Sequence, residues 1–438
     1  MSKIKPRVLK GFRDYLPTTM IPRQKMLATI EATFQRFAFV PLMTPALELL
    51  EILKGKYGAE GESLLYSFED QGDRQVALRY DLTVPLARVV AQYGELTLPF
   101  RRYQIAPVWR AEKPQRGRFR EFSQCDGDIV GSADMAADAE ILQLACSLLD
   151  DLGVANYTIQ VNNCKVLSGL MRRIHVDEGV AEAGVLRTID KLPKIGREKT
   201  EELLKNESGL SSEQVAGIFE FLSIEGDTDE KLRKLDGLFV DGGGRQGVDE
   251  LRQLFRFVRA LSLDGLITLD LSIARGLNYY TGTVYEAFLR DLSGIGAVMG
   301  GGRYDGLIGV FKGQEVPAVG ISLGIDRLLQ GLVELKLLEE SRSVAQVLVT
   351  VFDAESAPHS ARIAQDLRRG GVACEFYPGA AKLGKQFRHA ERAGMGWVIV
   401  LGPDEQAQGK VQVKDLETGA QEAVPEKELV GYLSGRVG

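Results

Sequence analysis

Apolar residues recur at intervals of three and four in two N-terminal segments, residues 22–38 and 136–150. This spacing gathers them on one side of an α-helix, so both segments are predicted to be amphipathic helices. The first would begin at Pro22, since proline fits the first turn of a helix, and end before Pro41. The inward positions would be Met26, Leu27, Ile30, Phe34 and Phe37 in the first helix, and Ile141, Leu144, Ala145 and Leu148 in the second.

Between these helices, the chain has the alternation of a β-hairpin. Residues 103–110 and 118–130 would be its strands, and the turn formers Pro114 and Gly117 lie between them. Side chains two residues apart share a face of a strand, and a core would not accept so many unpaired charges. An exposed, solvated strand is the alternative, but the aromatic and amide side chains in the same period favour a binding surface. The residues on related faces are Arg110, Arg118, Arg120, Phe122, Gln124, Asp126 and Asp128.

The middle of the chain, residues 178–262, is charged and has helical periodicity. It is predicted to be a helical insertion in a larger domain. The run from Val240 to Arg245 contains three consecutive glycines. Because no strand precedes this run, a flexible loop at the tip of the insertion is favoured over a phosphate-binding loop.

The C-terminal part alternates between strands and helices after a boundary near 330–344, in which residues 338–343 are polar. This order predicts a small α/β domain with a mostly parallel sheet. The predicted strands are 346–352, 371–377 and 396–401, the helices are 357–369 and 382–393, and a terminal hairpin turns at 417–419.

Composition narrows the class of protein. The 438 residues allow two or three domains, and 45% hydrophobic and 26% charged residues are ordinary for a globular protein. There is no apolar run near 18 residues and no signal peptide, so we expect a cytoplasmic protein without a membrane partner. Four scattered cysteines argue for a reducing compartment and against zinc, and three scattered histidines argue against histidine-based catalysis.

Positive charge is concentrated within this acidic chain. Residues 101–120 contain seven Arg or Lys and one Glu, whereas the whole chain has a net charge of −6. Such a basic segment is where an anion binds. Two other runs, RYDLT (79–83) and RGLNYY (275–280), also combine charge with polar and aromatic residues. Together the three runs predict a pocket for a polyphosphate and a small polar substrate.

The C-terminal domain contains a run that imitates a phosphate-binding loop. Residues 379–385 fit G-x-x-x-x-G-K, but Gln386 follows where a Ser or Thr must reach magnesium. The spacing instead places Lys382, Lys385, Arg388 and Arg392 on one helix face. This face suits RNA phosphates, and a merely solvated face is the alternative.

The block from Trp109 to Gly131 resembles motif 2 of the class II aminoacyl-tRNA synthetases, whose pattern is Arg-x-Glu, a loop, then Arg-x-x-x-Phe. Here these positions are Arg110, Glu112, Arg118 and Phe122. The tail REFSQCDGDIVG is similar to the histidyl-tRNA synthetases. Other segments resemble the same family in the same order: GFRDYLP (11–17), PLMTPALE (41–48) as motif 1, RYDLTVPLARVVA (79–91), ARGLNYYTGTVYEA (274–287), and GGGRYDGL (300–307) with GISLGIDRLL (320–329) as motif 3.

The resemblance covers essentially the whole chain and implies its fold. The expected catalytic domain, residues 1–330, is α+β and built on a mainly antiparallel sheet that carries the helical insertion. Residues 331–344 would be a linker and residues 345–438 an α/β anticodon-binding domain. The resemblance also implies a homodimer through motif 1.

The implied activity is that of a histidine–tRNA ligase with L-histidine, ATP, Mg²⁺ and the tRNA for histidine as its partners. Arg110 and Arg275 would be catalytic by holding the carboxylate and the α-phosphate, and Arg327 would contact the γ-phosphate. Phe122 would stack on adenine, Glu112 would lie near its amino group, and Arg118 would belong with the outer phosphates. The resemblance assigns no magnesium ligands.

The resemblance also implies which residues bind the other two substrates. Asp81, Leu82 and Thr83, supported by Gln124, would receive the α-amino end of histidine. Asp128 and Tyr280 would contact the imidazole and Tyr279 the pocket wall, although adjacent tyrosines on a strand point to opposite faces. Gly300, Gly301, Gly302 and Gly306 would allow close backbone approach around the ligand. The tRNA would contact Lys113, Gln115, Arg116, Lys382, Lys385 and Arg388.

Some positions depart from the family pattern. Asn278 stands where Asp is usual, and Ala111, Ser123 and Gly127 replace bulkier residues. One alternative function is a non-catalytic paralogue, the regulatory subunit of ATP phosphoribosyltransferase. It is disfavoured because the C-terminal domain and the signatures are present. A stand-alone RNA-binding protein would leave the pocket residues unexplained.

Overall fold

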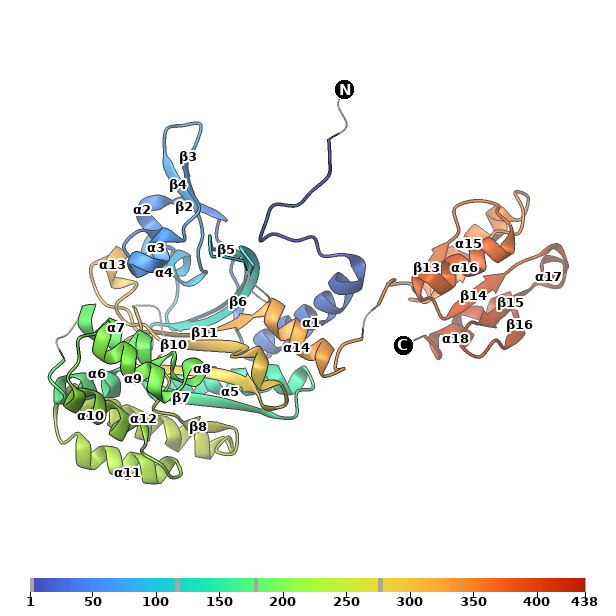
Figure 1. Cartoon of the computed structure of the whole chain (residues 1–438). Coiled ribbons are helices and arrows are strands. Elements are labelled where there is room, and N and C mark those ends of the chain that lie inside the picture. Colours follow the sequence, from blue (N-terminus) through green and yellow to red (C-terminus); the bar gives the residue numbers. More distant parts are fainter. Residues whose placement is uncertain (1–3, 115–118, 177–179, 275–278, 340, 438) are drawn as a thin grey trace. The chain divides into compact units, whose positions relative to one another are not determined.

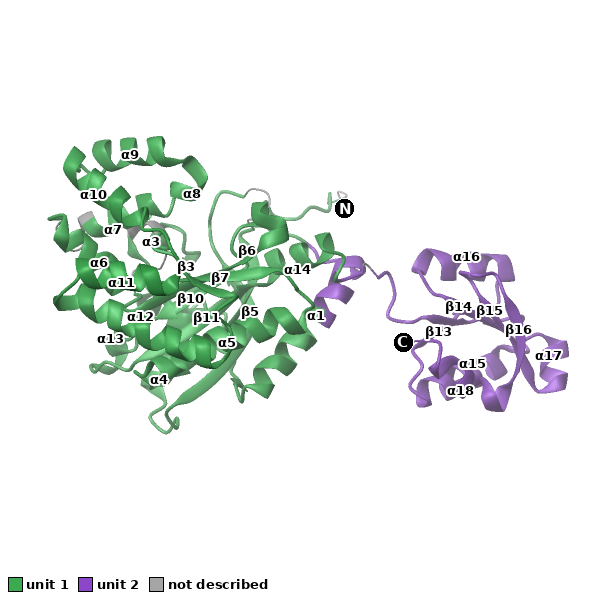
Figure 2. Ribbon diagram, turned by 90° about the horizontal axis from the view of Figure 1, so that it is seen from below, with its two compact units in different colours: residues 1–13, 26–337 green, residues 14–25, 338–438 purple. Residues whose placement is uncertain are grey.

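The computed structural model describes residues 4–114, 119–176, 180–274, 279–339 and 341–437. Two compact units divide the chain (Figure 2). The first unit comprises residues 1–13 and 26–337, and the second comprises residues 14–25 and 338–438. None of the helices in the described ranges has both the length and the apolar composition needed to cross a membrane.

The first unit is built on an eight-stranded sheet within the described residues (Figure 1). Five of its seven neighbouring pairs are antiparallel, and only β1–β5 and β7–β8 are parallel. The prediction of a mainly antiparallel sheet is therefore confirmed. In spatial order the strands are β1 (Val40–Pro41), β5 (Phe100–Trp109), β6 (Glu121–Val130), β11 (Ala318–Gly324), β10 (Met299–Arg303), β9 (Thr283–Leu289), β7 (Tyr157–Asn163) and β8 (Ile267–Leu269).

The predicted hairpin is confirmed as β5 and β6, which pair with Arg102 opposite Asp128 and Ala106 opposite Gln124. Its two faces have different roles. A Cβ atom at Gly127 would lie 2.3 Å from the ring of Phe34, so bulkier residues are excluded where the sheet packs on helix α1 (Pro17–Arg36). The neighbouring even-numbered residues of β6 point to the opposite face, because side chains alternate along a strand.

Both predicted amphipathic helices are present, but the start of the first was wrong. Helix α1 begins at Pro17 and contains Pro22 inside it. The sequence prediction placed Pro22 at the first position of the helix, which Pro17 occupies instead. Helix α5 (Met135–Asp151) begins as predicted, because the Asp134 carboxylate accepts a hydrogen bond from the amide of Ala136 (2.8 Å) and caps the helix.

The charged middle segment is helical throughout most of its described length. The predicted loop from Val240 to Arg245 was wrong, because helix α12 begins at Gly242. The glycines serve helix packing: a Cβ atom at Gly169 of α6 (Cys164–Arg173) would lie 2.7 Å from the Cα of Gly244. The helices are α7 (Val180–Ile189), α8 (Leu192–Ile195), α9 (Arg197–Asn206), α10 (Ser212–Leu222), α11 (Thr228–Leu238) and α12 (Gly242–Ala260).

Smaller elements of the first unit complete the surroundings of the site. A three-stranded sheet contains β2 (Leu47–Leu49), β4 (Gln75–Leu78) and β3 (Ser67–Glu69). Three helices lie between or after these strands, and three more follow strands β9, β10 and β11 of the large sheet. They are α2 (Leu50–Leu53), α3 (Gly58–Ser63), α4 (Thr83–Gln92), the 3-10 helix η1 (Arg290–Ile295), α13 (Gly309–Lys312) and α14 (Ile325–Glu334).

The second unit contains a five-stranded sheet in the order β13 (Cys374–Phe376), β12 (Val347–Val349), β14 (Trp397–Val400), β15 (Lys410–Asp415) and β16 (Gln421–Pro425). The pairs β13–β12 and β12–β14 are parallel, whereas β14–β15 and β15–β16 are antiparallel. The sheet is therefore mixed, and the prediction of a mostly parallel sheet was wrong. The terminal hairpin adds the antiparallel strands. Its helices are α15 (Ala357–Arg369), α16 (Leu383–Ala393), α17 (Pro403–Gln408), the 3-10 helix η2 (Glu426–Glu428) and α18 (Leu429–Ser434).

Candidate active site

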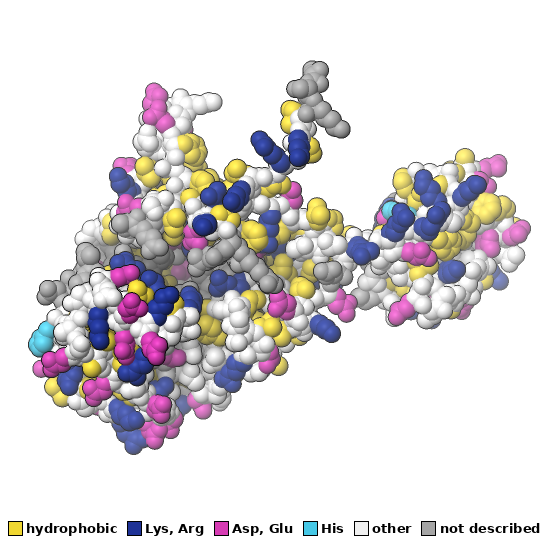
Figure 3. All heavy atoms as spheres, in the orientation of Figure 1, with side chains coloured by type: hydrophobic (Ala, Val, Ile, Leu, Met, Phe, Trp, Pro, Cys, Tyr) yellow, Lys and Arg dark blue, Asp and Glu magenta, His cyan; other side chains and the backbone are white. Residues whose placement is uncertain are grey.

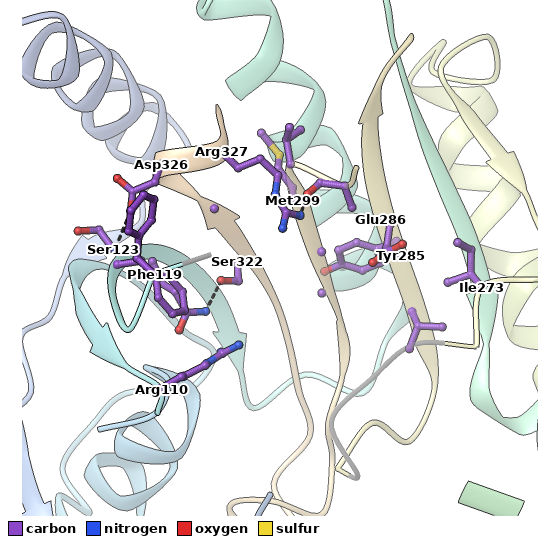
Figure 4. Close-up of a pocket in the computed structure, with 18 of the residues that line it drawn as sticks. Arg110, Phe119, Ser123, Ile273, Tyr285, Glu286, Met299, Ser322, Asp326 and Arg327 are labelled. Atoms are coloured by element: carbon purple, nitrogen blue, oxygen red, sulfur yellow. Dashed lines mark hydrogen bonds between the residues drawn. The ribbon is translucent and has the colours of Figure 1, made fainter. Parts of the chain in front are cut away.

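A cavity of about 450 Å³ lies on the large sheet, between β6, β9, β10, β11 and the start of α14 (Figure 4). It brings together residues from three of the sequence signatures. Of the residues that the sequence analysis proposed, Arg110, Glu112, Phe122, Gln124, Tyr280, Gly300, Gly301 and Arg327 line it.

Two arginines reach the cavity from motif 2 and motif 3. The Nε of Arg110 donates to the carbonyl of Tyr80 (3.2 Å), and its guanidinium lies 4.3 Å from the ring centre of Tyr80 and 5.1 Å from that of Phe122. Phe122 in turn packs on buried Leu82. Arg327 donates to the carbonyl of Ala297. Backbone carbonyls thus orient both cations before any ligand binds, and two aromatic rings also orient Arg110.

Several cavity residues were missed by the sequence analysis. Ser322 accepts a hydrogen bond from Nε2 of Gln124 (2.7 Å), and Glu286 and Tyr285 approach from β9. Ser322, Gly300 and Glu286 lie opposite one another on β11, β10 and β9, so the side chains of Ser322 and Glu286 share one sheet face (Figure 4). Tyr285 precedes Glu286 on β9 and points to the other face. The only available signal was their position inside the quoted signatures. The full set of missed polar and aromatic residues is Phe119, Ser123, Tyr285, Glu286, Ser322 and Asp326.

The glycines of motif 3 serve strand packing as well as the cavity. A Cβ atom at Gly301 would lie 2.1 Å from the carbonyl oxygen of Gly320, and one at Gly302 would lie 2.5 Å from that of Thr283. A Cβ atom at Gly306 would meet nothing within 4 Å, so the surrounding protein does not require glycine there, and close approach of its backbone to a ligand stays a prediction.

A buried acidic cluster lies on the hairpin and the segment before α4. Asp81, Asp126 and Asp128 are each 2% exposed, and Arg102 beside them is fully buried. Nη2 of Arg102 lies 2.8 Å from Oδ2 of Asp128, whose Oδ1 accepts from the hydroxyl of Tyr304 (2.5 Å). Arg102 therefore pairs directly with Asp128 and acts on Asp81 and Asp126 through its charge. This cluster has an excess of potential negative charge, which a cationic ligand would compensate.

Four buried acceptor oxygens in this region have no hydrogen-bond partner among the described residues: Oδ2 of Asp81, Oδ1 of Asp126, Oδ2 of Asp128 and Oε1 of Gln124. Of these, Oδ2 of Asp128 is ion-paired with Arg102. The other oxygen of Asp81 accepts from the hydroxyl of Tyr57 (3.0 Å). Buried polar atoms are normally paired, so unpaired acceptors in a site indicate where a ligand donates.

Burial raises the pKa of all three carboxyls, and that of Asp126 to about 7. Arg102 opposes this shift, whereas the neighbouring Asp128 increases the pKa of Asp126. Asp126 is also hydrogen-bonded to Ser322. At neutral pH, part of the population therefore keeps Asp126 protonated and uncharged.

Protonation of Asp126 predicts a pH-dependent stability. The pKa of Asp126 in the folded protein lies above the value of 3.8 in the unfolded chain. The contribution of Asp126 to the free energy of unfolding is therefore fully present below about pH 3.8 and is lost as the pH rises through 7. Asp126→Asn should remove this loss. We expect the free energy of unfolding of the variant, relative to the natural protein, to increase by on the order of 2 kcal/mol between pH 5 and pH 7. Denaturant unfolding at both pH values measures it, and a pH-independent difference would contradict a shifted Asp126.

The two proposed tyrosines differ in position. Tyr280 lines the cavity, whereas the ring of Tyr279 contacts those of Tyr280 (5.0 Å between centres) and Tyr304 (5.9 Å). Thr83 is the first residue of α4, and the carbonyl of buried Leu82 accepts from Nη2 of Arg102 (3.1 Å). The RYDLT signature is thereby connected to Asp128 through one arginine.

Arg275, Asn278, Arg118, Gln115 and Arg116 are outside the described residues, and Lys113 is exposed. On α16 and the residue before it, Lys382, Lys385, Arg388 and Arg392 are all exposed. Figure 3 shows Lys and Arg side chains gathered on one part of the second unit.

Gln386 explains why the nearby glycine-rich run is not a phosphate loop. It is fully buried, and its Nε2 donates to the carbonyls of Val351 and Ala381 (both 2.7 Å). Its Oε1 accepts from the amide of Val351 (2.9 Å). The residue that would need a magnesium-binding hydroxyl therefore joins α16 to the end of β12.

The antiparallel sheet and the cavity formed by motifs 2 and 3 define the fold of a class II aminoacyl-tRNA synthetase. A sequence model described as "Histidyl-tRNA synthetase" matches residues 11–328, and another described as "Anticodon binding domain" matches residues 346–436. The chain belongs to the histidyl-tRNA synthetase family.

Similar proteins support this assignment along the whole chain. A protein of Rhodopirellula baltica named "Histidine--tRNA ligase" is 44% identical over 420 residues, which cover 95% of this chain and 94% of that protein. The crystal structure of histidyl-tRNA synthetase from Nostoc sp. PCC 7120 matches with a TM-score of 0.87 and 34% identity, covering 99% of this chain and 100% of the other.

A second similar structure bears on the regulatory alternative. A Bacillus halodurans structure titled as an ATP phosphoribosyltransferase regulatory subunit/histidyl-tRNA synthetase has a TM-score of 0.72 and covers 88% of this chain and 97% of its own. Its sequence is only 22% identical, so this likeness concerns the fold alone. The ligase relatives and the anticodon-binding domain do not favour the regulatory alternative.

Proposed function

We propose that this chain activates L-histidine with ATP, which forms histidyl-adenylate and pyrophosphate, and then transfers histidine to the 3′-terminal adenosine of its tRNA. One observation carries this proposal. A single cavity joins Arg110, Glu112 and Phe122 of motif 2 to Arg327 of motif 3, next to Gln124 and Tyr280. Asp126, Asp128 and Arg102 of the buried acidic cluster lie on the same hairpin.

The first step needs no side-chain nucleophile. The carboxylate of histidine attacks the α-phosphorus of ATP in line, and the bond to the pyrophosphate oxygen breaks. Positioning the reactants and neutralising the developing negative charge accomplish most of the catalysis. We assign this work to Arg110 and Arg275, with Arg327 on the γ-phosphate and Arg118 near the outer phosphates. Phe122 would stack on adenine and Glu112 would accept from its amino group.

Recognition of histidine is assigned to the acidic cluster and its neighbours. The α-ammonium group would donate to Asp81, Thr83 and Gln124, two of which have an unpaired buried oxygen. Asp128 would accept from the imidazole, and Tyr280 would contact its other edge. Asp128 is held by Arg102 and Tyr304, so its carboxylate is already oriented. Tyr279 would support Tyr280 from behind, as the ring contact suggests.

Magnesium would enter with ATP. Among the described residues, no group of three His, Cys, Asp or Glu side chains is placed to hold a metal ion. The cavity does offer the carboxylates of Glu112, Glu286 and Asp326. This donor set fits an ion that is bound mainly by phosphate oxygens and water, as Mg²⁺ commonly is. We propose Glu286 as the side chain closest to such an ion.

The tRNA would contact both units. Lys113, Gln115 and Arg116 belong to the motif 2 loop and would meet the acceptor end. The exposed face with Lys382, Lys385 and Arg388 would meet phosphates of the anticodon region in the domain spanning residues 345–438. The catalytic domain would span residues 1–330, with the insertion at 178–262 and a linker at 331–344.

The proposed tRNA face predicts a separable effect. Replacing Lys385 and Arg388 together by Glu should weaken tRNA binding and reduce its salt dependence, because fewer counterions are released. Pyrophosphate exchange with histidine needs no tRNA and should be unchanged. Glu391→Lys on the same helix is a suitable control of opposite charge, and filter binding at several salt concentrations is the measurement. Normal binding at every salt concentration would show that this face is only solvated.

Dimerisation through motif 1 is a further part of the proposal. Apolar side chains there are exposed in the single chain: Met43 by 68%, Val40 by 48% and Leu49 by 43%. An adjacent hollow is lined by residues such as Thr44, Glu48 and Arg88. Clustered exposed apolar residues indicate a protein interface. We also propose a cytoplasmic location, which the four free cysteines support.

Exchange of labelled pyrophosphate into ATP tests the proposed activity. The purified protein should catalyse exchange only when L-histidine is present, and other amino acids should not replace it. Charging of the tRNA for histidine then tests the second step. A protein that shows neither reaction, while folded and able to bind ATP, would disprove the ligase function in favour of a regulatory role.

A further inference from the structure

The segment before α1 lies against the base of the motif 2 loop. The carbonyl of Gly11 accepts from the amide of Arg120 (2.8 Å), and the carbonyl of Lys10 accepts from its Nη1 (3.4 Å). Gly11 has a φ of +90°, and a Cβ atom there would lie 2.8 Å from the side chain of Arg120. Both the conformation and the space therefore require glycine, so this close contact is part of the fold.

Arg120 transmits this contact to two residues proposed to bind ATP. Its carbonyl accepts from the amide of Arg110 (2.9 Å), and its Nε donates to the carbonyl of Glu112 (3.0 Å). The N-terminal segment is therefore connected to the backbone on which Arg110 and Glu112 are carried.

Arg13 makes the second connection, directly at the cavity. Its Nη2 lies 2.7 Å from Oδ1 of Asp326, and its guanidinium carbon lies 3.8 Å from the ring centre of Phe119. The other oxygen of Asp326 accepts from the amide of Ser123 (3.3 Å). Phe119 and Asp326 both line the cavity, from the motif 2 and motif 3 sides, and appear near each other in Figure 4.

The local chemistry distinguishes Arg13 from an ordinary surface arginine. Exposed ion pairs contribute little, but the side chain of Asp326 is only 11% exposed. A planar guanidinium can stack on an aromatic ring and pair with a carboxylate at the same time, which an ammonium group cannot do equally well. Asp326 also precedes Arg327 in the first turn of α14.

We propose that Arg13 is a positioning residue for ATP, which fixes Phe119 and Asp326 on either side of the ATP end of the cavity. This inference rests on the proposed function. Arg13 acts through these two residues and needs no contact with the nucleotide. Its loss should therefore weaken ATP binding selectively, because the histidine end of the cavity is held by Arg102, Tyr57 and Tyr304.

The test compares Arg13→Ala and Arg13→Lys with Arg7→Ala, an exposed arginine of the same segment. Steady-state exchange gives KM for ATP and for histidine, and calorimetry gives the Kd of ATP independently of catalysis. We expect Arg13→Ala to raise the Kd and KM for ATP about tenfold, as the loss of one stacked and ion-paired group predicts. KM for histidine should stay within about twofold. Arg13→Lys should be intermediate, and Arg7→Ala should match the natural protein.

A second variant tests whether Arg13 acts through Phe119. In a Phe119→Leu background, Arg13→Ala should add much less to the Kd of ATP than it does alone, because the two residues are in contact. An unchanged ATP affinity, an equal rise of both KM values, or full additivity with Phe119→Leu would overturn the proposal. Absence of exchange in the natural protein would reject the ligase function instead, and the ATP Kd values would still decide the role of Arg13.

Discussion

Asp128→Ala should lower kcat/KM for histidine by about 10⁴, while the Kd of ATP changes little. When a binding site forms hydrogen bonds with its substrate, the loss of one partner of such a pair lowers kcat/KM by about this magnitude. Asp128 is the carboxylate that Arg102 and Tyr304 orient, and it lies directly over Gly320, where a Cβ atom would be 1.9 Å from its Oδ1. Exchange rates at varied histidine and ATP concentrations measure the effect.

The control for this variant must separate recognition from folding. Removing Asp128 leaves fully buried Arg102 without its ion-pair partner, which typically costs about 3–5 kcal/mol of stability. Asp128→Asn keeps the size of the side chain and can still accept from Tyr304, so it should be more stable than the alanine variant. Loss of ATP binding together with histidine use in both variants would identify Asp128 as a structural residue only.

Arg110→Ala should slow histidine-dependent exchange by roughly 10²–10³, equivalent to about 3–4 kcal/mol of transition-state stabilisation. Arg110 is held over Tyr80 and Phe122 with its Nε on a backbone carbonyl, so its charge is oriented before the reaction begins. The loss should appear mainly in kcat, because negative charge grows on the α-phosphate in the transition state. Arg275→Ala should have an effect of the same size and only a smaller one on histidine affinity.

Arg101→Ala is the matched control for the arginine variants. Arg101 lies on the same hairpin, but its side chain pairs with Glu140 of α5 (2.8 Å) and is partly exposed. Its loss should leave the exchange rate close to that of the natural protein. A near-normal rate for Arg110→Ala would exclude Arg110 from transition-state stabilisation, and an equal loss for Arg101→Ala would indicate a general disturbance of the hairpin.

The arginines show how far the sequence alone could assign roles. Arg79, Arg120 and Arg303 all belong to signatures rich in charge, yet each serves the fold. Arg79 donates to the carbonyls of Thr44 (2.7 Å) and Pro107 (2.9 Å), and Arg303 forms a buried ion pair with Asp138. Local sequence cannot distinguish such arginines from Arg110, because the difference lies in which carbonyls and carboxylates other segments bring near them.

The sequence by itself determined the hairpin, the two long helices, the mainly antiparallel sheet and the family. The hairpin and the helices follow from the periodicity of apolar residues within one segment. The sheet and the family follow from several sequence motifs that occur in the order typical of the family. It misplaced features whose cause lies in another segment. The glycines after Asp241 permit close packing of α12 on α6, and Pro22 lies inside a helix that starts one turn and a half earlier.

Only the tertiary structure decided which charges meet. It placed Asp81, Asp126 and Asp128 around fully buried Arg102, and it brought Arg13 from the N-terminal segment to Asp326 of α14. Arg13 and Asp326 lie far apart in sequence, and Asp81, Arg102 and Asp126 belong to different segments, so their interactions depend on how these segments pack and pair. Burial then raised the pKa of Asp126 to about 7, because removal from water destabilises the charged carboxylate. A desolvation energy of this kind depends on the surrounding atoms, and these are defined only when the chain has folded.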